Sequence, residues 1–422
     1  MGGKMVVVGL DIGTKNIRVV VAESKEDSRT EVLAFSTVPS AGIANGVIVS
    51  IESAMNRIKE AIDEAEQNCG IEISDCIVSI GGDQIEGFNS SGLYIVSHTG
   101  SPKEISKEDV RKAIEVAISI KTPLDKEKLH VIPQMYAVDE VVGIKDPVTR
   151  LGIRLESNVH IITTSRTIIQ NLRSCVERAG YEISGVMLKT LAATYAVVHQ
   201  DELDLGSIII DLGEGSTDVL VVLNGAPIFT GSIPLCGYHV TKDIQLIRDI
   251  SLDEAEKIKI EYGCCWPELA DTSRTILIPG VGGRAPEEIS QRELCDDINP
   301  RMTEIFEHVL DLIRQNTNVN KLSGNIILTG GGAKMEGVVE LCQEVFSTGY
   351  VRVGIPENLG GDSSEYRSPE WATAIGLVLS NNTMVSRREY SKSRKNFPFS
   401  RSAKNSSSKK ESKLKKFKKM FF

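Results

Sequence analysis

The hydrophobic pattern of this chain repeats itself once. β-Branched residues dominate residues 6–21 and again residues 207–222, and each run is interrupted by an aspartate and a short glycine-bearing loop. Such residues favour extended strands, and a tight loop between two apolar runs predicts a hairpin. The sequence therefore predicts two similar hairpins about 200 residues apart, with Asp11 and Asp211 at the ends of their first strands. The repetition indicates a duplicated arrangement.

A third glycine loop joins a predicted strand to a predicted helix. Residues 325–329 form a strand-like run, Gly330, Gly331 and Gly332 follow, and apolar positions at helical spacing predict a helix over 336–346. Bare glycine backbone can lie flat against a planar base or sugar. An ordinary turn at the N-terminus of a helix is the alternative.

Serine caps predict two further helices, one over 106–118 and another over 251–263. The second helix carries Glu256 and Lys259 on adjacent turns. A carboxylate at this position could accept hydrogen bonds from ribose hydroxyls. A solvated ion pair at i, i+3 spacing is the alternative interpretation.

The two hairpin loops have the composition of phosphate-binding loops. Gly13, Gly213 and Gly215 let the backbone approach a ligand, and successive N–H groups in such turns form an anion-binding concavity. Asp11 and Asp211 could hold a hydrated Mg²⁺ beside a phosphate chain. One such hairpin more often contains plain turn residues, but two copies favour a phosphate site.

Length and composition indicate a soluble α/β protein of several domains, because 422 residues exceed a single hydrophobic core. No apolar run approaches the ~18 residues that span a bilayer, and the N-terminal run is too short for a signal peptide, so we expect a cytoplasmic protein. The eight cysteines form no C-x-x-C pair, which favours buried reduced thiols over a zinc site. His130 and His160 lie in strand-like segments and are expected to be structural.

The charge of the chain is divided between an acidic body and a basic tail. Residues 386–422 carry a net charge of +12 and residues 1–385 carry −21, against −9 for the whole chain. A nucleic-acid enzyme does not usually show this distribution, so we expect no nucleic-acid partner. Residues 381–408 contain few apolar side chains, which predicts a flexible basic linker.

The last residues, 409–422, have a different pattern. Apolar side chains recur at spacings of three and four, and lysines occupy the remaining positions. The pattern predicts a basic amphipathic helix that binds an anionic membrane surface reversibly. A disordered basic end is the alternative. The candidate membrane-binding residues are Leu414, Lys415, Lys416, Phe417, Lys418, Lys419, Met420, Phe421 and Phe422.

The order of the three loops resembles that of a known superfamily. DIGT (11–14), DLGEGSTD (211–218) and TGGGA (329–333) are similar to the phosphate 1, phosphate 2 and adenosine motifs of the actin superfamily. Within it, nearly the whole chain resembles the FtsA family of bacterial cell-division proteins. The most specific segments are LHVIPQMYAVDE (129–140), LGIRLESNVHII (151–162), IPLCGYHVTKDI (233–244), VGGRAP (281–286) and INPRMTEIFEHV (298–309).

The resemblance implies an α/β, actin-like ATPase fold of two duplicated halves with a family-specific insert called 1C. The implied divisions are subdomain 1A at 1–82, 161–190 and 361–380, 1C at 83–160, 2A at 191–230 and 310–360, 2B at 231–309, the disordered linker at 381–408 and the C-terminal amphipathic helix at 409–422. The implied phosphate-binding residues are Gly13, Thr14, Lys15, Asn16, Gly213, Gly215, Ser216 and Thr217. The implied adenosine-binding residues are Glu256, Lys259, Gly330, Gly331, Gly332 and Met335.

The resemblance also implies a function. The chain would bind ATP and Mg²⁺, polymerise with itself, anchor polymers of the tubulin-like protein FtsZ to the inner face of the cytoplasmic membrane, and recruit later division proteins. Arg301 and Glu304, on the helix after Pro300, are the positions implied to bind the FtsZ C-terminal peptide. Their i, i+3 spacing also suits an ordinary surface ion pair.

Two positions depart from the superfamily pattern. Relatives place a Glu or Gln to orient the attacking water, whereas residues 187–194 offer Lys189 and no carboxylate, so we expect slow or negligible ATP hydrolysis. Glu214 stands at the middle glycine of the second loop, where its carboxylate either points away or faces the metal. The alternative functions are a PilM-like actin-fold adaptor of pilus assembly and an actin-superfamily small-molecule kinase.

Overall fold

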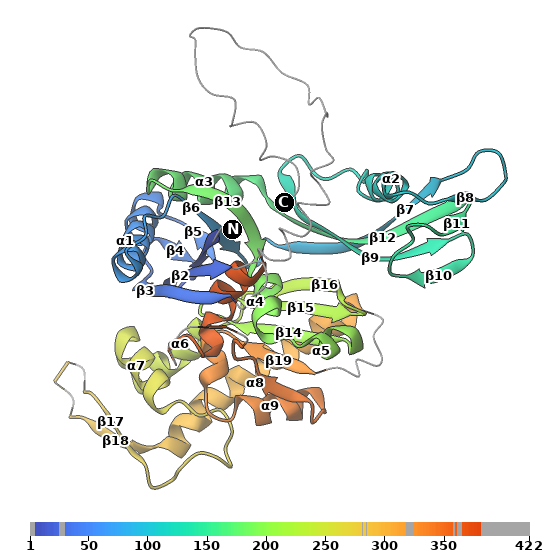
Figure 1. Ribbon diagram of the computed structural model, residues 1–422. Coiled ribbons are helices and arrows are strands. Elements are labelled where there is room, and N and C mark those ends of the chain that lie inside the picture. The colour runs from blue at the N-terminus through green and yellow to red at the C-terminus, as the bar shows by residue number, and fades with distance from the viewer. Residues whose placement is uncertain are drawn as a thin grey trace, which may run out of the picture.

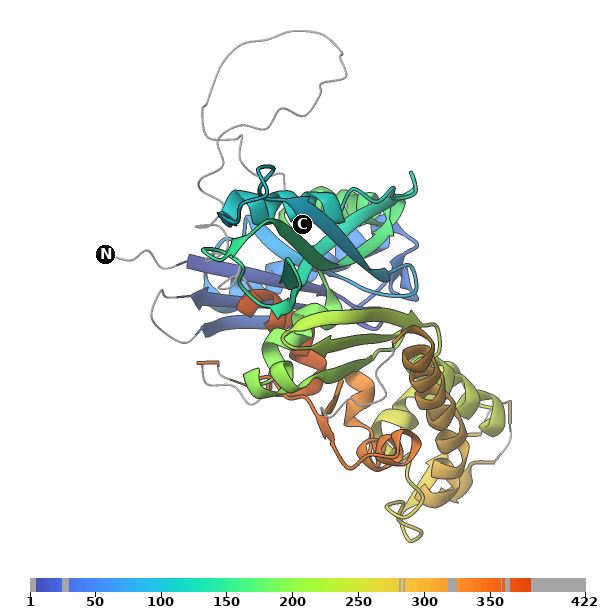
Figure 2. The same ribbon diagram turned by 90° about the vertical axis from the view of Figure 1, so that its right-hand side faces the viewer.

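The computed structural model describes residues 5–24, 30–280, 282–283, 285–317, 325–357, 359–360 and 365–380. Two five-stranded sheets form its two halves, which lie one above the other in Figures 1 and 2. Across the first sheet the strands are β13 (Glu182–Leu188), β6 (Asp75–Ile80), β1 (Met5–Ile12), β2 (Asn16–Ser24) and β3 (Glu31–Pro39). Across the second they are β20 (Val351–Val353), β19 (Ile326–Thr329), β14 (Ser207–Leu212), β15 (Thr217–Leu223) and β16 (Ala226–Ile233).

The two sheets have the same topology. The strands β1, β2 and β3 pair antiparallel, as do β14, β15 and β16. In each sheet the first hairpin strand then pairs in parallel with a fourth strand, β6 or β19, and the fourth with a fifth, β13 or β20. The prediction of two similar hairpins in a duplicated α/β fold is therefore confirmed.

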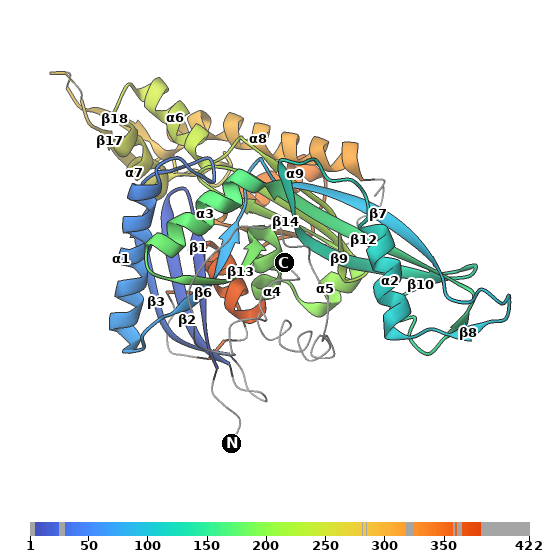
Figure 3. The ribbon, with the colours of Figure 1, turned by 90° about the horizontal axis from the view of Figure 1, so that it is seen from above.

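Helices α1 (Ile51–Cys69) and α3 (Arg166–Arg178) cover the outer face of the first sheet (Figure 3), beside the short pair β4 (Ile43–Ala44) and β5 (Val47–Ile48). The Ser50 hydroxyl caps α1, and Gly70 ends it in the left-handed conformation that glycine adopts without strain. Ile58 and Ile62 are fully buried between α1 and the sheet, because apolar side chains recur at helical spacing along one face.

A core between the halves holds them together. It contains α4 (Lys189–Val197) and the helical residues 372–380, and it joins Val20 of the first sheet to Ile327 of the second. A Cβ on Gly376 would lie 1.8 Å from the Ala192 carbonyl oxygen, so these two helices cross where only glycine fits. The 3₁₀ turn η2 (Pro369–Trp371) contributes Trp371 to this core, and the short helix α5 (Gln200–Leu205) follows α4 along the chain.

An insert extends from the first half, on the side away from α1 (Figure 3). Its four-stranded sheet contains β10 (Val141–Ile144), β9 (Lys126–Val138), β12 (Arg154–Ser165) and β7 (Glu86–Ile95), with the small pair β8 (Lys103–Glu104) and β11 (Leu151–Gly152). Helix α2 (Lys107–Ala117) packs on this sheet and begins with the capping box of Ser106 and Asp109 that the sequence predicted. The subdomain limits stay a prediction.

The second half carries α6 (Gly237–Arg248), α7 (Leu252–Tyr262), the pair β17 (Thr275–Ile278) and β18 (Glu287–Ser290), α8 (Gln291–Asn316), the 3₁₀ turn η1 (Gly331–Lys334) and α9 (Val338–Phe346). The predicted helix after Pro300 is present, but it begins earlier than expected, because α8 starts at Gln291 and contains Pro300. Ile298 and Met302 on either side of the proline are both buried in one core, so packing carries the helix through it.

The predicted linker at 381–408 and the predicted membrane helix at 409–422 lie outside the described residues. Within the described ranges no helix is long and apolar enough to cross a membrane. The eight cysteines are free thiols and all except Cys69 are buried, in agreement with the expectation from the sequence.

Candidate nucleotide-binding site

The loops of the two duplicated hairpins close in the same way. In the first, the Gly13 N–H donates to the Asn16 carbonyl at 3.1 Å, and in the second the Gly213 N–H donates to the Ser216 carbonyl at 3.1 Å. A Cβ on either glycine would lie 2.5 or 2.7 Å from that carbonyl oxygen, so both turns exclude a side chain. Gly13 and Gly213, both predicted to bind phosphate, are therefore needed for the close turn of their loops.

The two hairpin loops meet although they belong to different halves. A Cβ on Gly215 would lie 2.3 Å from the Thr14 hydroxyl oxygen, which itself accepts a hydrogen bond from the Gly46 N–H at 3.0 Å. Residues 13–16 and 213–217 thus face one another across the junction of the halves. Two loops that face one another in this way are expected where a phosphate chain is held between them.

The third glycine loop lies against the second hairpin. Gly330 has a φ of 81°, and a Cβ on it would lie 2.2 Å from an Asp211 carboxylate oxygen. Gly331 has nothing within 4 Å of its Cβ position, so its backbone borders open space. Met335 follows as the C-cap of η1 and packs against the core of the second half. Bare backbone is therefore available beside the phosphate loops.

The predicted helix over 336–346 begins later than expected. Residues 331–334 form the 3₁₀ turn η1, and α9 starts only at Val338. Gly337 precedes it with a φ of 80°, and a Cβ there would lie 2.3 Å from the Cβ of Trp266. The close approach to Trp266 fixes a left-handed residue that an α-helix cannot contain, so the helix starts after it.

Helix α7 brings two charged side chains to the same place. The Lys259 ammonium donates hydrogen bonds to the Gly237 carbonyl at 3.0 Å and to the Thr241 hydroxyl at 2.7 Å, and it forms an ion pair with the Glu256 carboxylate at 2.7 Å. Glu256 in turn pairs with Lys15 of the first hairpin loop. Because the Lys259 side chain is only 9% exposed, the interpretation of a solvated surface pair is wrong. Glu256 and Lys259 lie at the junction of the halves.

The side chain of Glu214 points toward this pair on α7. Its carboxylate lies 3.4 Å from the Lys259 ammonium. Burial raises the pKa of Glu214 above its ordinary value, and the positive charge of Lys259 opposes the rise. The sequence left open whether this carboxylate points away or faces the metal, and in the structure it points toward Lys259.

Carboxylates from both hairpins converge beneath the loops. Asp11 and Asp211 each lie next to the last residue of their strands, near the ends as predicted, and Asp218 is the cross-strand partner of Asp211 in the β14–β15 pair. Burial, with the charge of Asp218 next, raises the pKa of Asp211 to about 7. Lys189, the first residue of α4, places its ammonium 3.4 Å from an Asp11 oxygen. We call Asp11, Asp211, Asp218 and Lys189 the carboxylate cluster.

Sequence reasoning did not find Ser79 and Asp218 as members of this site. The Ser79 hydroxyl donates to the Asp11 carboxylate at 2.7 Å and accepts from the Ile12 N–H at 3.1 Å. Asp218 accepts from the Gly82 N–H at 3.2 Å. Asp218 could have been found, because it stands opposite Asp211 in the predicted hairpin, whereas Ser79 comes from a distant strand without any local pattern.

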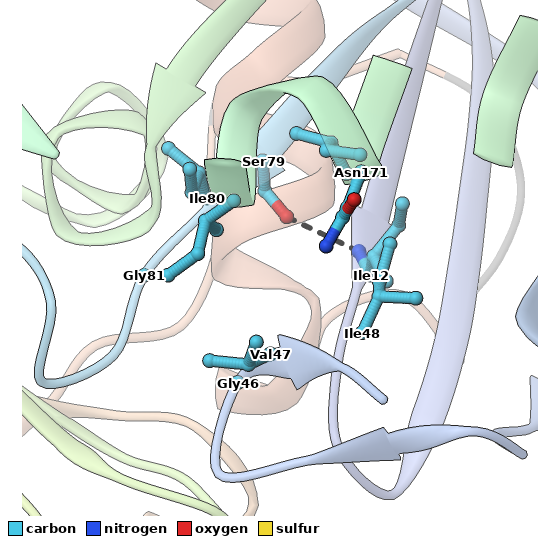
Figure 4. A pocket seen from close by; sticks show the side chains of 10 residues that line it. Ile12, Gly46, Val47, Ile48, Ser79, Ile80, Gly81 and Asn171 are labelled. Carbon is cyan, nitrogen blue, oxygen red and sulfur yellow. Dashed lines mark hydrogen bonds between the residues drawn. The ribbon is translucent and has the colours of Figure 1, made fainter. Parts of the chain in front are cut away.

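A small cavity lies at the ends of β1 and β6, next to the first hairpin loop (Figure 4). Its walls are mainly apolar side chains of β5, β6 and α3. The hydroxyl of Ser79 faces the backbone nitrogen of Ile12 in it (Figure 4). The Ser79 hydroxyl in this cavity is already used to hold Asp11 and the adjacent backbone.

The carboxylate oxygens of the cluster suit a hydrated Mg²⁺, because this ion prefers oxygen ligands and keeps several of its waters. Asp11 and Asp211 are the residues predicted for it. Within the described part of the chain, no group of three or more His, Cys, Asp or Glu side chains is arranged to hold a metal ion directly.

The two residues implied to bind a partner peptide lie on α8, away from the loops. The Arg301 guanidinium pairs with the Asp243 carboxylate of α6 through two bonds of 2.6 and 3.2 Å, and it also pairs with Glu304. Arg301 and Glu304 therefore share one helix face, as their spacing predicted. The candidate membrane-binding residues, 414–422, are outside the described residues.

Two family models match this chain. The model described as Cell division protein FtsA matches residues 208–376, and that described as SHS2 domain inserted in FTSA matches residues 82–163. The Cell division protein FtsA of Borreliella burgdorferi is 41% identical over 374 residues, which cover 88% of this chain and 90% of that protein.

Solved structures share the fold at low sequence identity. The PilM–PilN type IV pilus biogenesis complex has a TM-score of 0.62 at 16% identity, covering 89% of this chain and 98% of that chain. MreB5 of Spiroplasma citri bound to ADP has a TM-score of 0.56 at 16% identity, covering 91% and 98%. These likenesses establish an actin-like fold.

Proposed function

The chain belongs to the FtsA family of bacterial cell-division proteins, and from this we propose that it binds ATP and anchors FtsZ polymers to the inner face of the cytoplasmic membrane. Self-polymerisation and recruitment of later division proteins at the division site are part of the same proposal. A PilM-like role in pilus assembly is not proposed, because the likeness to PilM is one of fold alone. A small-molecule kinase is not proposed either, because no observation favours it.

The observation that carries ATP binding is the meeting of four segments at the junction of the halves. Two glycine loops face each other, bare backbone at Gly331 borders open space, and α7 supplies Lys259 and Glu256. Backbone N–H groups and a lysine suit phosphate oxygens, and glycine backbone suits a flat base. A relative in fold, MreB5 of Spiroplasma citri, is bound to ADP in its solved structure, which supports a nucleotide as the ligand.

The test uses a glycine whose side-chain position is open. Gly331→Glu should fold normally, because nothing lies within 4 Å of its Cβ, yet it should fill the space proposed for the base. Gly349, which lies beyond the end of α9 and also has no neighbour within 4 Å, offers the matched control Gly349→Glu. In titrations with labelled ATP we expect Gly331→Glu and Asp211→Ala to abolish binding and the control to retain it. ATP binding by both site variants at the level of the natural chain would contradict the proposal.

Hydrolysis should be slow. The segment that would orient the attacking water provides Lys189, whose ammonium pairs with Asp11 and cannot accept a proton from water. Steady-state turnover should therefore lie far below the ~1–100 per second of ordinary kinases. Magnesium-dependent turnover within that range would contradict this part of the proposal.

The FtsZ C-terminal peptide is proposed to bind the face of α8 that carries Arg301 and Glu304. Because Arg301 also holds Asp243 with two bonds, its substitution would disturb the fold, and Glu304 is the better probe. Glu304→Lys should weaken binding of the peptide in a direct titration. Asp296→Lys makes the same charge change on an exposed position of the same helix and should leave the affinity unchanged. Equal affinities for all three proteins would place the contact elsewhere.

Membrane attachment is proposed for residues 409–422, which the structure does not describe. Truncation before Lys409, or Phe417→Glu with Phe421→Glu, should release the protein from anionic liposomes in a sedimentation assay, because the apolar face is lost. Phe397→Glu with Phe399→Glu makes the same change in the predicted linker and should leave binding intact. One short helix binds weakly, so tight binding should require polymers that present many tails. Undiminished binding by the truncated chain would refute the assignment.

A further inference from the structure

Lys189 is a cation in a place where helix electrostatics disfavours it. It is the first residue of α4, and the N-terminus of a helix carries a partial positive charge that repels a lysine. Its side chain is only 14% exposed, so water does not compensate for the repulsion. The preceding residue, Leu188, is held by its N–H donating to Nε2 of His130 at 3.0 Å, which fixes the start of the helix. The position of Lys189 therefore requires a local source of negative charge.

The three aspartates of the carboxylate cluster supply that negative charge. The ammonium lies 3.4 Å from Asp11, and the negative charges of Asp11, Asp211 and Asp218 all act on it. The ammonium thus offsets the negative charge of carboxylates from both halves of the molecule.

The backbone at Gly81 and Gly82, directly after β6, leaves room for the Lys189 side chain. A Cβ on Gly81 would lie 2.9 Å from the Lys189 side chain and 2.9 Å from the Asp218 carboxylate, so both side chains border Gly81 where only hydrogen fits. The Gly82 N–H donates to the other oxygen of Asp218 at 3.2 Å, which orients that carboxylate. The loop after β6 is therefore built to let Lys189 and Asp218 lie side by side.

The neighbouring cations have other ion-pair partners, although the charge of Arg18, the cross-strand partner of Asp11, also opposes the rise in the pKa of Asp211. Arg18 donates to Glu370 at 3.0 Å and its guanidinium lies over the ring of Trp371. Lys15 pairs with Glu256 on α7. Lys189 is thus the ammonium whose charge acts on all three aspartates of the cluster, and without it these buried carboxylates would lose their main compensating charge.

We propose that Lys189 is a built-in cation of the nucleotide site, which supplies part of the charge that a divalent ion would otherwise bring to Asp11, Asp211 and Asp218. Nucleotide binding by this chain then depends only weakly on Mg²⁺, because the carboxylates are already neutralised in part before a triphosphate arrives. The inference deepens the proposed ATP binding and rests on it for the nucleotide measurement, but the charge of the cluster can be tested without nucleotide.

The experiment compares the full-length natural chain with Lys189→Gln, Lys189→Arg and the control Lys257→Gln. Lys257 is 69% exposed and pairs with Glu254 on the outer side of α7, so its loss removes a similar ion pair away from the cluster. Two quantities are measured for each protein: the melting temperature with and without Mg²⁺ alone, and the Kd for labelled ATP in Mg²⁺ and in EDTA.

For the natural chain, Lys189→Arg and the control, we expect Mg²⁺ alone to leave the melting temperature unchanged and EDTA to weaken ATP binding by less than about threefold. For Lys189→Gln, we expect Mg²⁺ alone to raise the melting temperature by several degrees and EDTA to weaken ATP binding by about tenfold or more, because three carboxylates then need the added ion.

Each alternative outcome overturns one claim. A natural chain that loses ATP binding tenfold or more in EDTA would refute the proposal, even if Lys189→Gln failed to fold. A Lys189→Gln protein with the same Mg²⁺ response as the natural chain would refute it as well. Absence of ATP binding by the natural chain under all conditions would refute the proposed function, whereas stabilisation of Lys189→Gln by Mg²⁺ alone would still support Lys189 as the cation of the cluster.

Discussion

Two buried histidines should make this protein sensitive to mild acid. Nδ1 of His160 lies 2.8 Å from the Asn89 side-chain oxygen and Nε2 lies 2.9 Å from the Thr230 hydroxyl, so this ring joins the insert to β16 of the second half. The Nε2 atom of His130 accepts the Leu188 N–H and must be unprotonated to do so. Neither ring can take up a proton without losing these bonds or charging a buried site.

The magnitude follows from the two pKa values. Burial lowers the pKa of His130 and of His160 from 6.5 to about 4. A histidine with a lowered pKa is protonated first in the unfolded chain, so its contribution to stability is complete above pH ~6.5 and is lost as the pH falls toward ~4. At pH 5 the loss is about 2 kcal/mol for each ring, or about 4 kcal/mol for both.

Urea unfolding followed by circular dichroism at pH 7.5 and pH 5 measures this loss. The double variant His130→Gln with His160→Gln should start less stable at pH 7.5, because hydrogen bonds are lost. On acidification, however, it should lose about 4 kcal/mol less than the natural chain. His98 is exposed, so His98→Gln should follow the natural chain. An equal loss of stability in the double variant and the natural chain would show that these rings do not cause the acid sensitivity.

Three further predictions concern packing and polar contacts, and denaturant unfolding measures each of them. Ser79→Ala should lower the free energy of unfolding by about 1–3 kcal/mol, because it leaves the buried Ile12 N–H without an acceptor. It should also weaken binding of labelled ATP, because Asp11 loses the hydrogen bond that holds it; unchanged stability and affinity would contradict this prediction. Gly376→Ala should cost about 1–3 kcal/mol or more by forcing two helices apart; a neutral effect would show that they separate freely. Arg352→Met should cost about 2 kcal/mol, because Arg352 donates to Glu202 at 2.6 Å; no measurable cost would mean that water replaces the pair.

The sequence by itself determined the features that depend on neighbouring residues. The two hairpins, their closing glycines and the strand-ending aspartates followed from β-branched runs and glycine loops, because hairpin geometry is set within a few residues. The start of α2 and the limits of α7 followed from Ser106, Ser251 and Gly263, because capping groups act on the nearest turn. The repetition of one hairpin pattern was enough to indicate the duplicated sheets.

Only the tertiary structure decided where these local pieces meet and what surrounds their charges. Pro300 lies inside α8 because residues on both sides of it share one core, and α9 starts late because Gly337 approaches Trp266. Lys259, which spacing alone placed in a surface pair, is buried where α7 meets the hairpin loops.

The carboxylate cluster depends most on the tertiary structure. Its members Asp11, Lys189 and Asp218, and the Ser79 hydroxyl that donates to Asp11, come from four separate segments, and their spacing in the chain carries no pattern. The charge state of such a group depends on burial and on neighbours a few ångströms away, which the packing of the two halves creates. For this reason the sequence could point to the phosphate loops and to Lys189, but not to the aspartates that this lysine meets beneath the loops.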